Sequence, residues 1–136
     1  LYASYLDAQC EMLDAVRPEV VGHFDLILLH DPDYLRTLSE PEIWARVMRN
    51  LERIRDAGAV LDINARALLK GQTEPYVCAP ILDAAARLGI RVAYGDDAHG
   101  VADVGCGYAV VEGMLAQRKM KGPDALVDQA LQRLDG

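Results

Sequence analysis

The fold is decided by residues 90–100, which read IRVAYGDDAHG, a short apolar run followed directly by a polar turn between glycines. The run from Ile90 to Tyr94 predicts a β-strand, and Asp97 and His99 follow its carboxyl end. Residues two apart face the same side of extended backbone, so we expect these two side chains to point one way. A carboxylate and an imidazole are ligands that suit zinc, manganese or iron. A capped turn is the competing interpretation, because Asp and Gly are common turn residues.

The rest of the chain alternates strand and helix patterns. We expect further strands over 19–27 and 59–64, helices over 1–16, 80–88, 108–119 and about 123–134, and a basic loop over 66–71. One more helix follows a capping box of Ser39 and Glu42, has Pro41 in its first turn, and ends at Gly58. There is no tight hairpin signal, so the pattern predicts an α/β fold with a parallel sheet covered by helices.

A pair of polar residues lies at the carboxyl end of each expected strand. The pairs are His23 and Asp25, Asp62 and Asn64, and Asp97 and His99. Active sites of parallel α/β folds gather at this end of the sheet, so we expect the pairs to converge there. A bound cation would offset the cost of burying carboxylates without partners. Taken singly, His23 is as well explained as a hydrogen-bonded core histidine, and Asp62 with Asn64 as a strand-to-loop cap.

Composition excludes several classes of function. The 136 residues, 51% hydrophobic and 26% charged, are typical of one globular domain. A net charge of −7 argues against nucleic acid or an anionic membrane as partner, and no run approaches the ~20 apolar residues of a membrane span. The three cysteines form no CxxC pair, so we expect reduced thiols, no structural zinc and a cytoplasmic location.

The basic loop after the second expected strand is the candidate for binding an anion. Arg66 and Lys70 would neutralise an anionic substrate there, although a solvated basic turn explains them equally well. The chain has no GxGxxG motif, P-loop or nucleophile elbow. No cysteine follows a strand, so a Cys–His dyad ranks low.

Four segments, in order, resemble the carboxyl-terminal half of histidinol-phosphatases of the PHP (polymerase and histidinol phosphatase) domain family. They are residues 20–26 (VVGHFDL), 61–64 (LDIN), 70–76 (KGQTEPY) and 95–105 (GDDAHGVADVG). The resemblance extends over roughly residues 5–115, and its last segment is closer to this enzyme than to the PHP domains of DNA polymerases.

This resemblance implies a distorted (β/α)7, TIM-like barrel with two or three divalent metal ions (Zn, Mn or Fe) at the strand ends. Residues 1–136 would form the C-terminal portion of that single domain. The family's other ligands, an opening His-x-His, a Glu and further His, would lie in an N-terminal half that this chain lacks. We therefore expect the chain to be about half of a barrel, truncated before Leu1, with a natural half-length relative as the alternative.

Matched position by position, His23, Asp97 and His99 would be metal ligands, and Asp97 and His99 would also be catalytic. Asn64, Arg66 and Lys70 would face the substrate.

The chain departs from the family pattern at two positions. Asp62 replaces the family's Glu, and Leu69 stands where an Arg usually precedes the lysine. The second departure leaves Arg66 as a substitute for the phosphate contact.

The implied activity is metal-dependent hydrolysis of histidinol phosphate to L-histidinol in histidine biosynthesis. The partner would then be a small-molecule phosphate monoester, with no nucleic acid or membrane involved, and we expect this chain alone to be incomplete and inactive. Another PHP-type phosphoesterase or nuclease stays open as an alternative. So does a non-catalytic α/β interaction module whose open sheet edge pairs with a partner. If the gene encodes a strand ending in His-x-His upstream of Leu1, the enzyme interpretation is favoured. A start codon near Leu1 would favour the interaction module.

Overall fold

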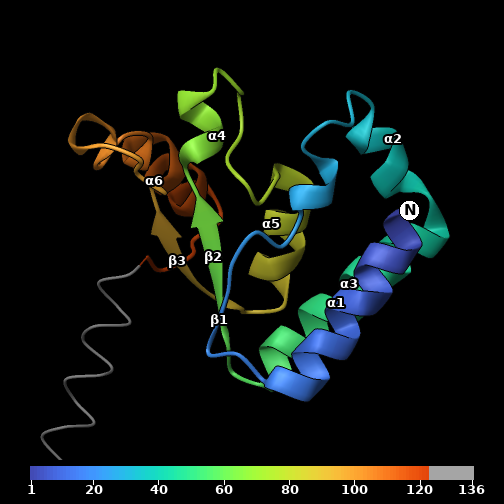
Figure 1. The fold of residues 1–136 in the computed structure, drawn as a ribbon. Helices are drawn as coiled ribbons and strands as arrows, with labels where there is room; N and C mark the ends of the chain where they lie inside the picture. The colour runs from blue at the N-terminus through green and yellow to red at the C-terminus, as the bar shows by residue number, and fades with distance from the viewer. Residues whose placement is uncertain (123–136) are drawn as a thin grey trace, which may run out of the picture.

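Three parallel strands form a sheet in the computed structural model, which describes residues 1–122 (Figure 1). They are β1 (Val20–Val21), β2 (Val60–Asn64) and β3 (Arg91–Gly95), and they lie in the order β1-β2-β3. Leu61 pairs with Val21 on one side and with Val92 on the other, while Asn64 pairs with Gly95. The predicted parallel α/β sheet is therefore confirmed.

Helices connect the strands. They are α1 (Tyr2–Val16), α2 (Tyr34–Ser39), α3 (Pro41–Asp56), α4 (Arg66–Leu69), α5 (Ala79–Arg87) and α6 (Tyr108–Gln117), with 3-10 turns at Leu26–Leu28 and Val101–Asp103. The helices predicted from apolar spacing are confirmed as α1, α3, α5 and α6. Pro41 begins α3, where its fixed φ suits a first helical turn. The helix predicted over about 123–134 lies outside the described residues.

The core lies where the helices cover the sheet. It contains the fully buried side chains of Phe24, Leu51, Ile54, Leu61, Ile63, Ile81 and Leu82. Helix α1 runs along α3, and α3 contacts α5 (Figure 1). Within residues 1–122, no helix is both long and apolar enough to cross a bilayer.

A buried polar network fixes the loop that follows β1. Asn50 of α3 donates to the Leu6 carbonyl at 2.8 Å and to Gln9 Oε1 at 2.9 Å, and Gln9 Nε2 donates to the Phe24 carbonyl at 2.9 Å. Both side chains are buried, so these bonds satisfy groups that would be costly to leave unpaired. Helices α1 and α3 thereby hold the segment that carries His23.

Three sequence predictions of local structure were wrong. The strand expected over 19–27 ends at Val21, because Phe24 and its neighbours bond to helix α1 instead of to β2. Ser39 does not cap α3; it ends α2, and its hydroxyl donates to the Arg36 carbonyl. The loop expected over 66–71 contains the one-turn helix α4.

Candidate functional site

The carboxyl ends of the three strands gather a polar group that we call the strand-end cluster, His23, Asp62, Asn64 and Asp97. Asp62 is central to it. A methyl group added to Gly22 or Gly95 would lie 3.9 or 3.6 Å from the Asp62 carboxylate, so both neighbouring segments leave room for this side chain. Burial raises the pKa of Asp62, the charge of His23 lowers it, and the charge of Asp97 raises it further. The charges of His23 and Asp97 therefore both reach the Asp62 carboxylate.

Asn64 joins the end of β2 to the loop after β3. Its side chain is 4% exposed, its Nδ2 donates to Asp97 Oδ2 at 3.4 Å, and its Oδ1 accepts the backbone N–H of Arg66 at 2.8 Å. The amide thus satisfies both of its ends while it positions the Asp97 carboxylate. The prediction that Asn64 and Asp97 meet at one end of the sheet is confirmed.

His23 and Asp97 both have left-handed backbone. Their φ angles are 52° and 50°, and only two other non-glycine residues in the described part have positive φ. Such a conformation costs a non-glycine residue roughly 1–3 kcal/mol and is found preferentially at functional sites. Tyr5 donates its hydroxyl to the His23 carbonyl at 3.3 Å, and the His23 ring lies 6.5 Å from the ring of Tyr76, centroid to centroid.

The prediction that Asp97 and His99 point the same way along extended backbone was wrong. The Asp96 carboxylate accepts the backbone N–H of Ala98 at 3.1 Å and of Gly105 at 2.6 Å, and these bonds fold the chain into a loop. His99 Nδ1 lies 2.7 Å from the Asp97 carbonyl oxygen. In the tautomer that donates this bond, Nε2 keeps its lone pair for a metal or a substrate proton.

Arg66 is occupied by an ion pair. Its Nη1 lies 2.7 Å from Asp103 Oδ2, and this oxygen also accepts the backbone N–H of His99 at 3.2 Å. The Arg66 guanidinium lowers the pKa of Asp103. Arg66 therefore helps to hold the His99 loop, a role that the sequence did not indicate. The one hint in the sequence was Asp103 itself, an acidic residue in the third polar segment to which no role had been given and which could pair with an arginine of the basic loop.

Lys70 lies at the carboxyl end of α4 and is exposed. In the described residues no side-chain contact joins it to the strand-end cluster. Its predicted contact with a substrate phosphate stays a prediction.

The side chains of the cluster are of the kinds that bind a divalent ion, but there are too few of them to form a complete metal site. Carboxylate oxygens and imidazole nitrogens are common ligands of zinc, manganese and iron. Within residues 1–122, however, no group of three or more His, Cys, Asp and Glu side chains is placed to hold a metal ion. An ion at this end of the sheet would need additional ligands.

Comparison with known proteins was made for sequence and for fold. No protein-family model matches the chain. A histidinol-phosphatase of Saccharomyces cerevisiae is 37% identical over 131 residues, which cover 80% of this chain and 39% of that protein. A probable histidinol-phosphatase of Schizosaccharomyces pombe is 28% identical over 133 residues, covering 91% of this chain and 44% of that protein.

A solved structure agrees with these relatives. The crystal structure described as that of the putative histidinol phosphatase hisK from Listeria monocytogenes superposes with a TM-score of 0.66 and 28% identity, covering 80% of this chain and 42% of that one. The fold and the candidate site together place this chain among parallel α/β proteins whose candidate site lies at the carboxyl ends of the strands. In sequence and fold, the chain is similar to histidinol-phosphatases, and the resemblance seen in the sequence is confirmed. It spans about two-fifths of the length of the relatives it matches.

Proposed function

We propose that the protein containing this chain hydrolyses the phosphate monoester histidinol phosphate to L-histidinol and inorganic phosphate, a reaction of histidine biosynthesis. The observation that carries the proposal is the 37% identity to the histidinol-phosphatase of Saccharomyces cerevisiae over 80% of this chain. The strand-end cluster supports it, because that end of a parallel sheet is where catalytic residues gather.

We further propose that residues 1–136 are the C-terminal portion of one PHP-type domain, a distorted (β/α)7 barrel. A strand followed by a helix is the repeating unit of such a barrel, and this chain contains three adjacent parallel strands with connecting helices. The similarity in fold to a longer chain, of which the match covers 42%, supports this proposal. We place the protein in the cytoplasm, in keeping with its three free cysteines.

His23, Asp97 and His99 are the proposed ligands of a site for two or three divalent ions of zinc, manganese or iron, completed by ligands beyond these three. When bound, such ions supply Lewis acidity and positive charge at the phosphoryl group. His99 has its Nδ1 engaged by the Asp97 carbonyl, which leaves Nε2 as its ligand atom.

The chain's own side chains then orient the reactants. Asp97, held by Asn64, is proposed to accept a hydrogen bond from the attacking water and so to aim it at phosphorus. Lys70, exposed after α4, is the proposed cationic contact of the phosphate. Arg66 is proposed to act through Asp103, which it holds against the His99 loop.

Phosphate release by the full-length protein tests this function. We expect turnover of L-histidinol phosphate well above that of p-nitrophenyl phosphate, lost on chelation and restored by adding Zn, Mn or Fe back. Hydrolysis of a single-stranded DNA oligonucleotide but not of L-histidinol phosphate would favour the nuclease alternative. A folded, metal-supplied protein that hydrolyses neither would favour the non-catalytic module.

A further inference from the structure

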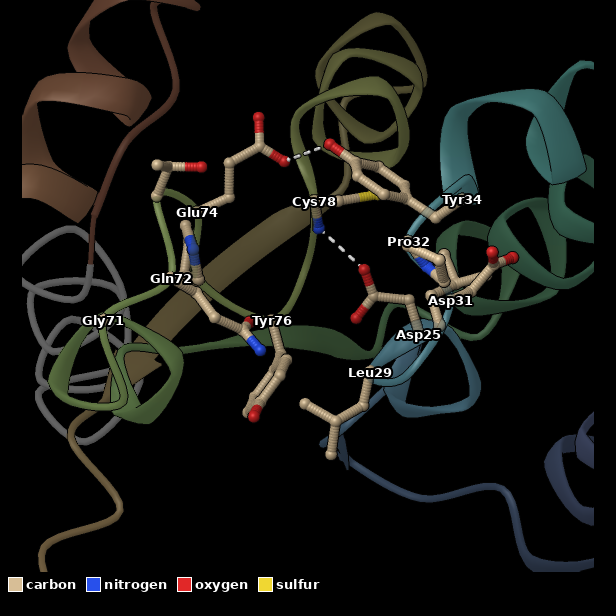
Figure 2. Close-up of a pocket in the computed structure, with 13 residues that line it drawn as sticks. Asp25, Leu29, Asp31, Pro32, Tyr34, Gly71, Gln72, Glu74, Tyr76 and Cys78 are labelled. Atoms are coloured by element: carbon tan, nitrogen blue, oxygen red, sulfur yellow. Dashed lines mark hydrogen bonds between the residues drawn. The ribbon is translucent and has the colours of Figure 1, made fainter.

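A second polar site adjoins the strand-end cluster. It is a cavity of about 360 Å³ between the loop after β1 and the segment that leads into α5 (Figure 2). Asp25, Asp31 and Glu74 contribute carboxylates to its lining, and no lysine, arginine or histidine of the described residues lines it. The cavity is therefore strongly acidic.

Asp25 contributes a buried carboxyl group to the cavity, and a bound cation would favour its ionised form. It is 5% exposed, and its Oδ2 accepts the backbone N–H of Cys78 at 2.7 Å. Its other oxygen, Oδ1, is buried and has no hydrogen-bond partner within residues 1–122, and Figure 2 shows it directed away from Cys78. A buried carboxylate oxygen without a donor is costly, so a positively charged donor in the cavity would stabilise it.

Glu74 supplies a second, fixed carboxylate. Its Oε2 accepts the hydroxyl of Tyr34 at 2.9 Å (Figure 2). The same oxygen accepts the backbone N–H of Ala79 at 3.3 Å. Burial and the bond to Glu74 raise the pKa of Tyr34 to about 12, so its phenol stays protonated and keeps donating. The carboxyl groups of Glu74 and Asp25 can together accept more hydrogen bonds than the surrounding protein donates to them.

The Asp31 carboxylate also lines the cavity, but it is fully hydrogen-bonded within the protein. Its carboxylate accepts hydrogen bonds from Tyr2 at 2.9 Å, from Thr37 at 2.6 Å and from the backbone of Asp33 at 2.9 Å. These donors satisfy Asp31 within the protein, so it is not the group that requires a ligand.

Tyr76 connects the cavity to the strand-end cluster. Its backbone N–H donates to the Asn64 carbonyl at 3.0 Å, and its ring lies beside that of His23. Its hydroxyl is a second buried polar group without a partner among the described residues, in the same cavity wall as Asp25. A molecule that reaches from one site to the other would have its anionic end near His23 and its other end in the acidic cavity.

We propose that this cavity is a subsite for a cationic nitrogen group of the substrate, an ammonium or an imidazolium, with Asp25 as its main counter-charge. The subsite rests on the proposed phosphatase function of the neighbouring cluster. It would make the enzyme select phosphate esters that carry a positive charge at the far end, and reject neutral alkyl phosphates.

A substrate series tests the subsite in the full-length protein. The series is L-histidinol phosphate, an imidazolylpropyl phosphate without the amine, phosphoethanolamine, and propyl phosphate, which carries neither cation. Asp25→Asn keeps an acceptor for the Cys78 N–H and removes the charge, while Asp33→Asn, an exposed residue of the same loop outside the lining, is the matched control. Glu74→Gln provides an independent variant, should Asp25→Asn fail to fold.

We expect Asp25→Asn to raise KM for the cationic substrates by about tenfold or more and to leave kcat/KM for propyl phosphate within about twofold. Comparison of phosphoethanolamine, which carries only the amine, with the imidazolylpropyl phosphate, which carries only the imidazole, shows which nitrogen occupies the cavity. Equal losses on propyl phosphate and on the cationic substrates would overturn the subsite, as would no loss on either.

Calorimetry with L-histidinol, which lacks the phosphate, separates this proposal from the function it rests on. Binding that depends on Asp25 in a protein without phosphatase activity would uphold the subsite and refute the phosphatase. If the protein is a phosphatase but Asp25→Asn and Glu74→Gln bind L-histidinol as well as the native protein does, the phosphatase function is upheld and the subsite is refuted.

Discussion

Arg66 Nη1 lies 2.7 Å from Asp103 Oδ2, and the same oxygen accepts the backbone N–H of His99. The ion pair thus ties the turn after β2 to the loop after β3. Both side chains are largely shielded, with 20% and 29% of their surfaces exposed, so solvent weakens this pair less than a typical surface pair.

We predict that Arg66→Gln and Asp103→Asn each lower kcat on histidinol phosphate by about tenfold, because the His99 loop loses its anchor. The double variant should lose little more than either single one, since both remove the same contact. The ion pair of Arg55 and Asp56 is the control, and Arg55→Gln should leave kcat unchanged. Additive losses in the double variant would show that Arg66 acts independently, as a direct phosphate contact.

The stability effect of Asp25 should depend on pH. Burial raises its pKa in the folded protein, so the folded state favours the protonated form. This contribution to stability is complete below the unfolded pKa and is lost as pH rises through the folded pKa. Asp25→Asn should therefore gain stability relative to the native protein as pH rises above the unfolded pKa of Asp25, measured by urea unfolding at a series of pH values. A difference that is constant, or that shrinks as pH rises, would refute a raised pKa.

Gly107 should not tolerate a side chain. Its φ is +83°, and an added Cβ would lie 3.0 Å from Leu68 Cδ1 and 3.1 Å from the Cβ of Ala65. We expect Gly107→Ala to lower the free energy of unfolding by about 1–3 kcal/mol. Gly113 of α6 is the control, because nothing lies within 4 Å of an added Cβ there, and Gly113→Ala should be neutral or stabilising. Equal effects of the two substitutions would contradict this packing.

The 136-residue chain by itself should bind divalent ions weakly, since within residues 1–122 no three donor side chains form a metal site. Titration calorimetry with Zn²⁺ should show low affinity and no fixed stoichiometry. Tight binding of two or more ions would mean that Asp62 or Asp25 also serves as a ligand.

The sheet and the long helices follow from the sequence because apolar periodicity is local. The loop after β1 does not, because its shape depends on distant partners: Gln9 bonds to Phe24 across 15 residues, and Asp25 bonds to the backbone of Cys78 across 53. These contacts end β1 early and bind the Asp25 side chain to the backbone of Cys78, whereas the sequence had paired Asp25 with His23 at a strand end.

The sequence placed two residues of the strand-end cluster, Asn64 and Asp97, at the same end of the sheet, but it did not give the geometry of the loops that carry Asp97 and His99. The position of Asp97 after a strand was sufficient to place it near Asn64. Its left-handed backbone, and the part of Asp103 in holding His99, arise from contacts across the loop that no local pattern signals. The acidic cavity was missed because two separate segments line it.

The central claim is that the strand-end cluster hydrolyses a phosphate ester, and phosphate release from L-histidinol phosphate by full-length Asp97→Asn tests it most directly. The amide keeps the shape of the side chain but removes its charge, so turnover should fall by about 10²-fold or more while circular dichroism stays native. Asp56→Asn is the matched control, at the end of α3 before β2 begins, and should keep full turnover. A folded Asp97→Asn protein that retains more than about a tenth of native turnover would remove Asp97 from the reaction and contradict the claim.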